Sequence, residues 1–563
     1  MQILNKIKLP EDIKKLSLDE LELLANDLRS VITRYTLANG GHLASNLGVV
    51  DLTCALNYVF DFPKDKLIFD VGHQCYAYKI LTGRLDKFDT LRQKDGLNGF
   101  PKREESEYDT VNSGHASTAL SIACGMARGN VDGNIICLIG DGAMTGGLFF
   151  EALNDVLTLN KKVIFIINDN NMSISDNVGF INEYLKILRR HGSESSFLDI
   201  EALNNIDGHN ISQLIDKFKY AKNSQKTLIL HIVTKKGKGL KEAELNPSKY
   251  HSVSASNTNT TYGSVFGDTL ERLAEKNNNI FAITAAMTDG TGLSNFAQKF
   301  PQRFVDVGIA EGHAVTMSAG LALSGAKPYV AIYSTFLQRA YDSVLHDVCI
   351  NNLPVVFCID RAGFVGGDGE THQGLYDVAY LSATPNMTIF APKDGEELKE
   401  ILSWSQNYNA PIAIRYPKSE IPCEYSVHTP IALGKWEWIK SSENQVVLIS
   451  NGETLANVCK SAKELKAQGI DVDVINARFI SHCDEEMLNT LRGKKLFFFE
   501  EYIMQNSIYS QVLDKFNVCQ DKTTKIYGVN VPNRNYAVAT RKELLKEVGL
   551  DSESITQFVK SKL

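Results

Sequence analysis

Short apolar runs alternate with amphipathic helical patterns along most of this chain, and this alternation is the feature that most constrains its fold. In the first half, apolar runs cover residues 67–70, 135–139, 163–167 and 228–233, with helical stretches between them. Runs that are apolar at every position and joined by helices are typical of parallel strands buried on both faces of a sheet. The sequence therefore predicts a doubly wound α/β unit in this region.

The same alternation returns twice further along the chain. It predicts a second α/β unit with apolar runs at 280–284, 304–307, 329–332, 355–359 and 412–415, and a third, smaller unit with runs at 446–449, 472–475 and 496–499. Polar stretches near residues 249–261 and 418–430 separate the units. A chain of 563 residues is also too long for one hydrophobic core. We therefore expect three doubly wound domains, over residues 1–255, 256–422 and 423–563.

Composition and charge argue against several classes of protein. Hydrophobic residues make up 44% and charged residues 22%, as in ordinary globular proteins, and the net charge of -7 comes without the basic stripe that nucleic-acid binding requires. The chain has neither the apolar run of a signal peptide nor the roughly 20 apolar residues of a membrane span. Its ten cysteines form no CxxC pair, which disfavours a zinc site. We expect a cytoplasmic protein with no nucleic-acid or membrane partner.

Polar residues follow two neighbouring strands of the first predicted sheet. The run IICLIGDGAMTGG from Ile135 ends a strand with Gly-Asp-Gly, and Asn170 ends the next apolar run 29 residues after Asp141. Ligands bind at the carboxyl ends of strands in open α/β sheets, and Mg²⁺ prefers oxygen ligands of this kind. A lone Gly-Asp-Gly also makes ordinary turns. The whole order, with Met172 following, resembles the signature of thiamine-diphosphate enzymes and predicts a metal and diphosphate site at Asp141, Asn170 and Met172.

Thiamine-diphosphate enzymes also use a glutamate from a second α/β domain. The segment GIAEGHAVTMSAG offers Glu311 for this role. In these enzymes a carboxylate at the aminopyrimidine ring favours the imino tautomer, whose nitrogen takes the proton from the thiazolium carbon. Glutamates are also common at helix starts for purely structural reasons. The pairing with the Gly-Asp-Gly motif favours the catalytic interpretation of Glu311.

Five longer motifs allow a family to be suggested. They are GGHLASNLGVVDLTCAL from Gly40, FDVGHQCYAYKILTGR from Phe69, SGHASTALS from Ser113, IYSTFLQRAYDSVLHDV from Ile332 and DRAGFVGGDGETHQG from Asp360. Together they resemble the 1-deoxy-D-xylulose-5-phosphate synthase family, closely from about residue 15 to 420 and more faintly in the third unit. The resemblance implies two thiamine-diphosphate-binding folds followed by a transketolase C-terminal-like domain, in a homodimer.

The resemblance also implies an activity and a set of residues. Family members decarboxylate pyruvate on thiamine diphosphate with Mg²⁺ and join the resulting enamine to D-glyceraldehyde 3-phosphate, in isoprenoid and thiamine biosynthesis. By this likeness the catalytic residues are Glu311, His42, His372 and Asp368. The cofactor would be bordered by His73, Gly114, His115, Ala116, Gly142, Ala143, Asn170, Glu311 and Phe336, and the substrate phosphate by Tyr333, Arg339, Arg361 and Arg415.

Several positions depart from the family pattern. Gly312 stands where glutamine is usual, Leu240 where tyrosine is common, and Lys418 where arginine is usual, and lysine lacks the planar fork of a guanidinium. The segment 180–197 is also much shorter than the family's loop-rich insertion. These departures keep two alternatives open, a related thiamine-diphosphate carboligase or transketolase with another donor or acceptor, and a cofactor-binding protein without turnover.

Overall fold

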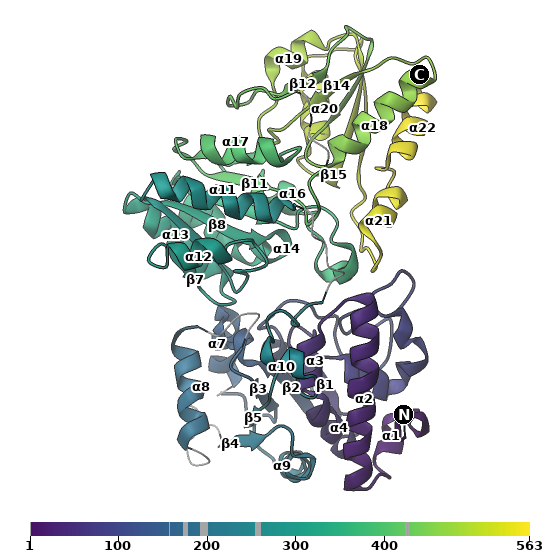
Figure 1. Cartoon of the computed structure of the whole chain (residues 1–563), viewed down its shortest axis with the longest axis vertical. Coiled ribbons are helices and arrows are strands. Elements are labelled where there is room, and N and C mark those ends of the chain that lie inside the picture. The colour runs from purple at the N-terminus through teal and green to yellow at the C-terminus, as the bar shows by residue number, and fades with distance from the viewer. Residues whose placement is uncertain are drawn as a thin grey trace.

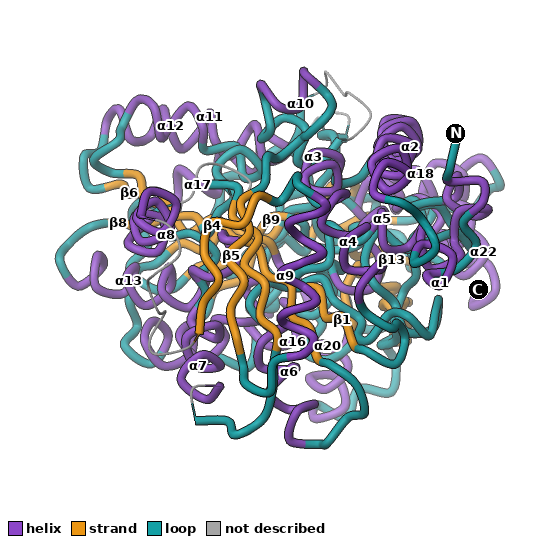
Figure 2. Tube along the Cα trace, turned by 90° about the horizontal axis from the view of Figure 1, so that it is seen from below, coloured by secondary structure: helices purple, strands orange, loops and turns teal. Residues whose placement is uncertain are grey.

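The protein is described by a computed structural model over residues 2–156, 158–172, 178–191, 201–253, 260–422, 425 and 427–563. In these residues the strands form three separate sheets, one in each predicted unit (Figure 1). Helices lie around the strands, which gather at the centre of the molecule when it is seen from below (Figure 2). The α/β fold class predicted from the sequence is confirmed.

The first sheet has five parallel strands in the order β1-β2-β3-β5-β4. Their bounds are β1 Lys66–Phe69, β2 Ile135–Gly140, β3 Ile164–Asp169, β4 Glu201–Asp207 and β5 Leu228–Val233. The helices of this unit are α1 Pro10–Ile13, α2 Leu18–Asn39, α3 Leu43–Gly48, α4 Val50–Val59, α5 Tyr76–Lys79, α6 Ala119–Arg128, α7 Gly147–Val156, α8 Gly179–His191, α9 Ile211–Asn223 and α10 Lys241–Leu245. Four of the strands match the predicted apolar runs, and β4 was missed because its residues are mostly polar.

The second sheet has six parallel strands in the order β10-β11-β9-β8-β6-β7. Their bounds are β6 Ile280–Thr284, β7 Phe304–Asp306, β8 Lys327–Tyr333, β9 Val356–Asp360, β10 Thr388–Phe390 and β11 Ile412–Arg415. The helices are α11 Tyr262–Lys276, α12 Ser294–Lys299, α13 Glu311–Leu323, α14 Ser334–Leu337, α15 Tyr341–Ser343, α16 Asp377–Leu381 and α17 Gly395–Ser405. The strand β10 was not among the predicted apolar runs.

The third sheet has the order β12-β14-β13-β15-β16, with β12 antiparallel to β14 and the other pairs parallel. Its strands are β12 Glu437–Lys440, β13 Val446–Ser450, β14 Asp473–Asn476, β15 Lys495–Ile503 and β16 Lys525–Val531. Its helices are α18 Thr454–Ala467, α19 Glu485–Thr490, α20 Ile508–Val518, α21 Arg541–Glu547 and α22 Ser552–Lys562.

The second and third units share one continuous apolar core, whereas the first unit has its own. Phe390 of the second unit and Phe479 of the third pack with ring centroids 4.2 Å apart. A buried ion pair, Lys393 with Glu437 at 2.7 Å, joins the same two units. The molecule therefore consists of two bodies, the first unit and the joined second and third units, which meet across the middle of Figure 1.

The predicted domain boundaries lie within or beside segments that are outside the described residues. The boundary at 255 falls within residues 254–259, and the one at 422 adjoins residues 423 and 424, which all lie outside the described residues. Among the helices of the described ranges, none combines the length and apolarity that crossing a membrane requires.

Candidate active site

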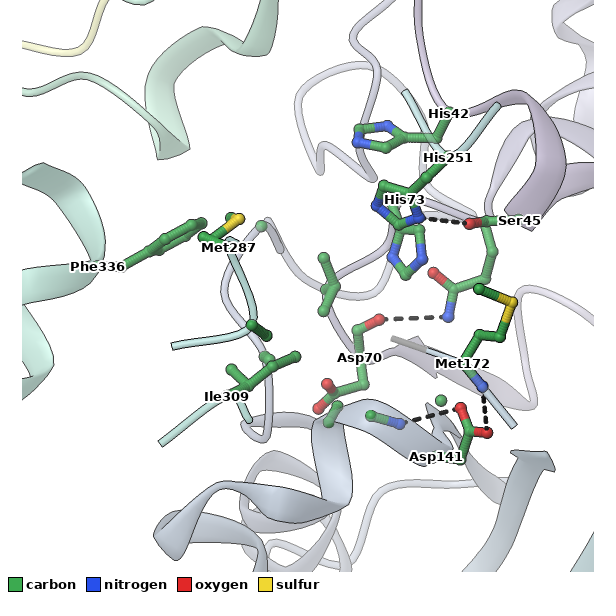
Figure 3. Close-up of a pocket in the computed structure, with 18 of the residues that line it drawn as sticks. His42, Ser45, Asp70, His73, Asp141, Met172, His251, Met287, Ile309 and Phe336 are labelled. Carbon is green, nitrogen blue, oxygen red and sulfur yellow. Dashed lines mark hydrogen bonds between the residues drawn. The ribbon is translucent and has the colours of Figure 1, made fainter. Parts of the chain in front are cut away.

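A cavity lies where the carboxyl ends of the first sheet face the second unit. It contains about 1040 Å³ of space not filled by atoms, part of it open to solvent. In Figure 3 the imidazoles of His42, His73 and His251 line one side, Phe336 lies opposite, and Asp141 lies at the far end. The cavity thus collects residues from both bodies of the molecule.

Asp141 lies at the end of β2, directly beside the end of β3. The two strands are parallel neighbours, with Gly140 opposite Asn168, so the polar residues after each strand meet at one edge as predicted. The Asp141 carboxylate accepts backbone N–H groups from Gly142 at 2.9 Å, Asn170 at 3.1 Å and Met172 at 3.2 Å. These bonds wrap the loop after β3 around the carboxylate and place Asn170 and Met172 next to it.

The electrostatics of this corner fit a cation. Burial and the neighbouring Asp169 raise the pKa of Asp141 to about 7, because two close carboxylates resist sharing one buried place as anions. Although burial opposes it, a hydrogen bond from His231 and the charge of Arg189 keep the pKa of Asp169 below its usual value. A divalent cation at Asp141 would favour its ionised form, and its oxygens together with Asn170 are ligands of the kind Mg²⁺ takes.

Three imidazoles form the wall of the cavity above this corner. The ring centroids of His42, His73 and His251 lie 5.4 to 5.5 Å from one another. Asn46 holds two of them in place, since its amide donates to the backbone oxygens of His42 at 2.6 Å and His73 at 2.7 Å. Ser45 Oγ lies 3.3 Å from His251 Nδ1.

These imidazoles are neutral in the folded protein. Burial lowers the pKa of His73 to about 3 and the pKa values of His42 and His251 well below their usual range. Within the described residues, the buried Nδ1 atoms of His42 and His73 have no hydrogen-bond partner. Lys236 is also buried at this wall and borders the cavity. A cation and ring nitrogens without partners suit a polar, anionic ligand such as a diphosphate.

Glu311 faces the cavity from the second unit. It is the first residue of α13 and only 5% exposed. Burial raises the pKa of Glu311, while the nearby charge of Arg339 acts in the opposite direction. Arg339 in turn donates to the backbone oxygen of Ala116 in the first unit. Glu311 is thus a buried carboxyl group that can exchange a proton with a polar ring placed against it.

A segment of the first unit, residues 114–119, also contributes to the cavity. The Asp70 carboxylate accepts the backbone N–H groups of Ser117 at 2.8 Å and Ala119 at 3.0 Å, which fixes the segment that contains Gly114 and Ala116. Gly114 permits a close approach of the two bodies, because a Cβ there would lie 2.4 Å from Thr371 Oγ1.

His372 lies at the other end of the cavity from Asp141. Its ring stacks on Phe100 with centroids 4.9 Å apart, and its Nδ1 lies 2.8 Å from Thr371 Oγ1. Burial lowers the pKa of His372, although Asp368 opposes this, and the ring is neutral near pH ~7. A neutral imidazole beside an apolar ring can exchange hydrogen bonds with a carbonyl or hydroxyl of a substrate.

A group of charges surrounds this end of the site. Arg92 donates to Asp368 at 2.8 Å, and the guanidinium of Arg361 lies 3.9 Å from the ring centroid of Tyr333. Although burial opposes it, Arg92 and then His372 and Lys418 hold the pKa of Asp368 far below its usual range. Asp368 is therefore an anion at neutral pH and does not serve as a proton donor.

Most of the residues predicted from the sequence come together in this cavity. Those that line it are His42, His73, Gly114, Ala116, Asp141, Gly142, Ala143, Asn170, Met172, Glu311, Phe336, Arg339 and His372. His115 is not among the lining residues; its ring packs against Phe336 with centroids 5.1 Å apart, and its Nε2 lies 3.0 Å from Thr335 Oγ1 and 3.1 Å from the Thr371 oxygen. Asp368, Tyr333 and Arg361 lie in the charged group just described.

The structure differs from the sequence prediction at Arg415. Its Nε donates to Asp377 at 3.0 Å, and its guanidinium lies over the ring of Tyr502, away from the cavity. Arg415 is 7% exposed, so a buried ion pair uses the charge that the prediction assigned to a substrate. Conversely, Ser45, Lys236 and His251 line the cavity although the sequence analysis did not select them. The KKGKG segment at residues 235–239 was a local signal for Lys236.

Family models match successive parts of the chain, and curated relatives match it over most of its length. The family model described as 1-deoxy-D-xylulose-5-phosphate synthase matches residues 4–202, the transketolase pyrimidine-binding domain matches 258–424, and the transketolase C-terminal domain matches 434–555. A 1-deoxy-D-xylulose-5-phosphate synthase from Clostridium perfringens is 45% identical and covers 98% of both chains. One from Clostridium acetobutylicum is 46% identical over 92% of both. A solved transketolase from Campylobacter jejuni is 18% identical, covers 97% of this chain and 100% of its own, and has a TM-score of 0.47.

Proposed function

The chain belongs to the 1-deoxy-D-xylulose-5-phosphate synthase family, and we propose that it joins pyruvate to D-glyceraldehyde 3-phosphate. The reaction releases the pyruvate carboxylate as CO₂ and forms a new carbon-carbon bond to the aldehyde, giving 1-deoxy-D-xylulose 5-phosphate. The observation that carries the proposal is the arrangement across the cavity, where Asp141 and Asn170 at two strand ends face Glu311 from the other body.

Thiamine diphosphate and Mg²⁺ fit the residues of the cavity. Asp141, Asn170 and the backbone at Met172 would hold the metal, and Lys236, His73 and His251 would meet the diphosphate. When bound, thiamine diphosphate supplies a carbon nucleophile that takes up the two-carbon unit of pyruvate. This assignment agrees with a buried carboxylate of raised pKa and with ring nitrogens that have no partner among the described residues.

The chain's own residues move the protons. Glu311 would hold a proton against a ring nitrogen of the cofactor, where burial raises its pKa and Arg339 limits that rise. His42 and His372, both neutral, would exchange hydrogen bonds with the oxygens of the reacting carbonyls. Phe100, stacked on His372, keeps water from this end of the site.

The aldehyde phosphate requires cations at the end where His372 lies. Arg92 and Lys418 lie close to Asp368 there, and Arg361 lies close to Lys418 and pairs with Asp360 at 2.5 Å. We assign the phosphate to Arg361 and Lys418. Lysine offers a point charge in place of a guanidinium fork, so phosphate binding would depend mainly on Arg361. Arg339 lies at the Glu311 end of the cavity, so we assign it to that carboxyl group.

We further propose that the enzyme is a homodimer, as the family resemblance implies, and that it works in the cytoplasm. Light scattering of the purified protein tests the oligomeric state, and a molar mass of one chain would contradict the dimer. Fractionation of cells that express the full chain tests the location.

The activity is tested with purified protein, pyruvate, D-glyceraldehyde 3-phosphate, Mg²⁺ and thiamine diphosphate. We expect CO₂ and a five-carbon ketose phosphate, detected by mass. CO₂ without this ketose would indicate another acceptor, and cofactor binding without CO₂ would indicate a protein without turnover. Glu311→Ala is expected to lower turnover by orders of magnitude, about 10²-fold to 10⁴-fold. Unchanged turnover would remove Glu311 from the mechanism.

A further inference from the structure

The loop of residues 361–374 contacts both the active site and the third unit. Near its two ends, Gly363 and Gly374 are joined by a pair of backbone hydrogen bonds, at 2.7 and 2.8 Å. Between them the loop carries Asp368 and His372, which belong to the acceptor end of the site. The position of this loop therefore determines where Asp368 and His372 lie at the end of the site proposed for the second substrate.

On one side the loop is held by the first unit. Arg92 donates to Asp368 at 2.8 Å, and Lys102 donates to Glu370 at 3.2 Å. These contacts cross between the two bodies of the molecule. They hold the tip of the loop but do not reach its base at residues 363–366.

On the other side the base of the loop is held by the third unit. Glu501, near the end of β15, accepts the backbone N–H of Phe364 on Oε1 at 2.9 Å. Its Oε2 accepts from the guanidinium of Arg541, which also pairs with Glu453 at 3.1 Å. Glu501 is 6% exposed, so both bonds lie in a protected environment.

The fit between the loop and the third unit is close. Gly363 has φ +81, and a Cβ on it would lie 2.6 Å from Glu501 Oε1. A Cβ on Gly366 would lie 2.3 Å from the backbone oxygen of Ala539. The base of the loop therefore lies directly against the Glu501 carboxylate and the chain before α21, with no room for a side chain between them.

The bonds that Glu501 accepts require a carboxylate. Its partners are all donors, the Phe364 amide on Oε1 and, on Oε2, Arg541 and the Thr454 hydroxyl at 3.4 Å. A carboxylate accepts on both oxygens, whereas a glutamine amide accepts on one and donates from its nitrogen. A glutamine at this position would leave a donor facing a donor.

None of the described residues of the third unit lines the cavity. We propose that Glu501 is a positioning residue, which acts through the Phe364 amide to fix the loop that presents Asp368 and His372 to the second substrate. The third unit thereby contributes to binding of the aldehyde without touching it. This inference rests on the proposed function of the site.

The adjacent residue on β15 provides a matched control. Glu500 is also a buried carboxylate, and it accepts backbone N–H groups from Ile508 at 3.0 Å and Tyr509 at 3.1 Å. Its side chain also bonds to Tyr502 and Asn530, so all of these partners belong to the third unit. Glu500→Gln therefore disturbs the same unit by the same chemical change but leaves the loop alone.

The experiment compares Glu501→Gln and Glu500→Gln in the holoenzyme. For Glu501→Gln we expect the KM for D-glyceraldehyde 3-phosphate to rise about tenfold, equivalent to roughly 1.4 kcal/mol, while thiamine diphosphate affinity in calorimetry changes less than about twofold. For Glu500→Gln we expect both quantities to stay within about twofold, even where its thermal midpoint falls. Amide hydrogen exchange of residues 363–374 should be faster only in Glu501→Gln.

A second variant addresses the same contact from the loop. Gly363→Ala would place a methyl group against Glu501, and we expect the same rise in KM and the same faster exchange as in Glu501→Gln. Unchanged KM and exchange in both variants would overturn the inference, and so would equal changes in Glu500→Gln. A wild-type protein that forms no ketose phosphate would refute the proposed function, and the exchange comparison would then decide the positioning role by itself.

Discussion

Replacement of Asp368 by asparagine tests how the loop of residues 361–374 is held against the first unit. Arg92 Nη1 and Asp368 Oδ1 lie 2.8 Å apart, and their side chains are only 11% and 21% exposed. Removing one partner of a buried ion pair costs about 3–5 kcal/mol, because the other charge stays buried without compensation. We reduce this to about 2 kcal/mol because the Asp368 side chain is 21% exposed, so solvent partly screens it.

A cost of about 2 kcal/mol lowers the ratio of docked to undocked loop by roughly 30-fold. The chain has several domains and need not unfold in one step, so global unfolding is a poor measure of this change. Native-state amide exchange of residues 363–374 measures the local opening directly. We expect protection of these amides to fall by roughly 30-fold in Asp368→Asn, with the amides of the central strands β2 and β3 unchanged.

A double-mutant cycle with Arg92→Met isolates the pair itself. Each single variant leaves one buried charge alone, whereas the double variant leaves none, so the double variant is expected to cost about 1–2 kcal/mol less than the sum of the singles. The exposed pair of Lys64 and Asp132, 3.5 Å apart with side chains 63% and 87% exposed, supplies the control, and Asp132→Asn should change nothing. Strict additivity in the cycle, or unchanged exchange in Asp368→Asn, would refute the reasoning.

Three further predictions concern the first unit. Asp141→Asn is expected to weaken joint binding of Mg²⁺ and thiamine diphosphate by roughly 100-fold or more in calorimetry, because the neutral amide lacks the anionic oxygens that a cation prefers and places its NH₂ group against backbone N–H donors. Unchanged binding would contradict this. Burial lowers the pKa of His73 to about 3 and of His115 to about 4, so unfolding binds protons below pH ~6.5 and the apo thermal midpoint should fall from about pH 7 to about pH 5.5. His73→Asn should flatten that dependence. Arg189 donates to Asn171 at 2.9 Å, and Arg189→Met should raise the Mg²⁺ concentration for half-maximal cofactor binding, with an unchanged titration as the opposing result.

The sequence predicted those parts of the site that follow from local pattern. Asp141 and Asn170 meet because each follows an apolar run, and parallel strands that are neighbours in a sheet end at the same edge. Glu311 was selected from its motif, and the structure places it in the same cavity. Apolar runs predicted most strands for the same reason, since a strand buried on both faces is apolar at every position.

The residues that the sequence missed or misassigned depend on long-range contacts. His251 lies within the polar stretch of residues 249–261 that was predicted as a linker, and only the packing of His251 against His42 and His73 brings it to the cavity. Arg415 ends an apolar strand much as a ligand-binding residue would, but Asp377 lies close enough to pair with it. Whether an arginine binds a substrate or a neighbouring carboxylate is set by tertiary contacts, which the local sequence does not encode.

The two bodies divide the chemistry of the site between them. Asp141, with Lys236 nearby, belongs to the first unit, whereas Glu311 and Arg339 belong to the second. Under the proposed assignment, metal and diphosphate binding would depend on one body, and the proton on Glu311 would depend on the other. A shift of one body relative to the other would move Glu311 against the cofactor ring without disturbing the groups around Asp141. Replacements at Glu311 should thus lower turnover while leaving the affinity for Mg²⁺ nearly unchanged. Among the described residues, the Asp141 carboxylate accepts hydrogen bonds from its own unit, and none comes from Glu311.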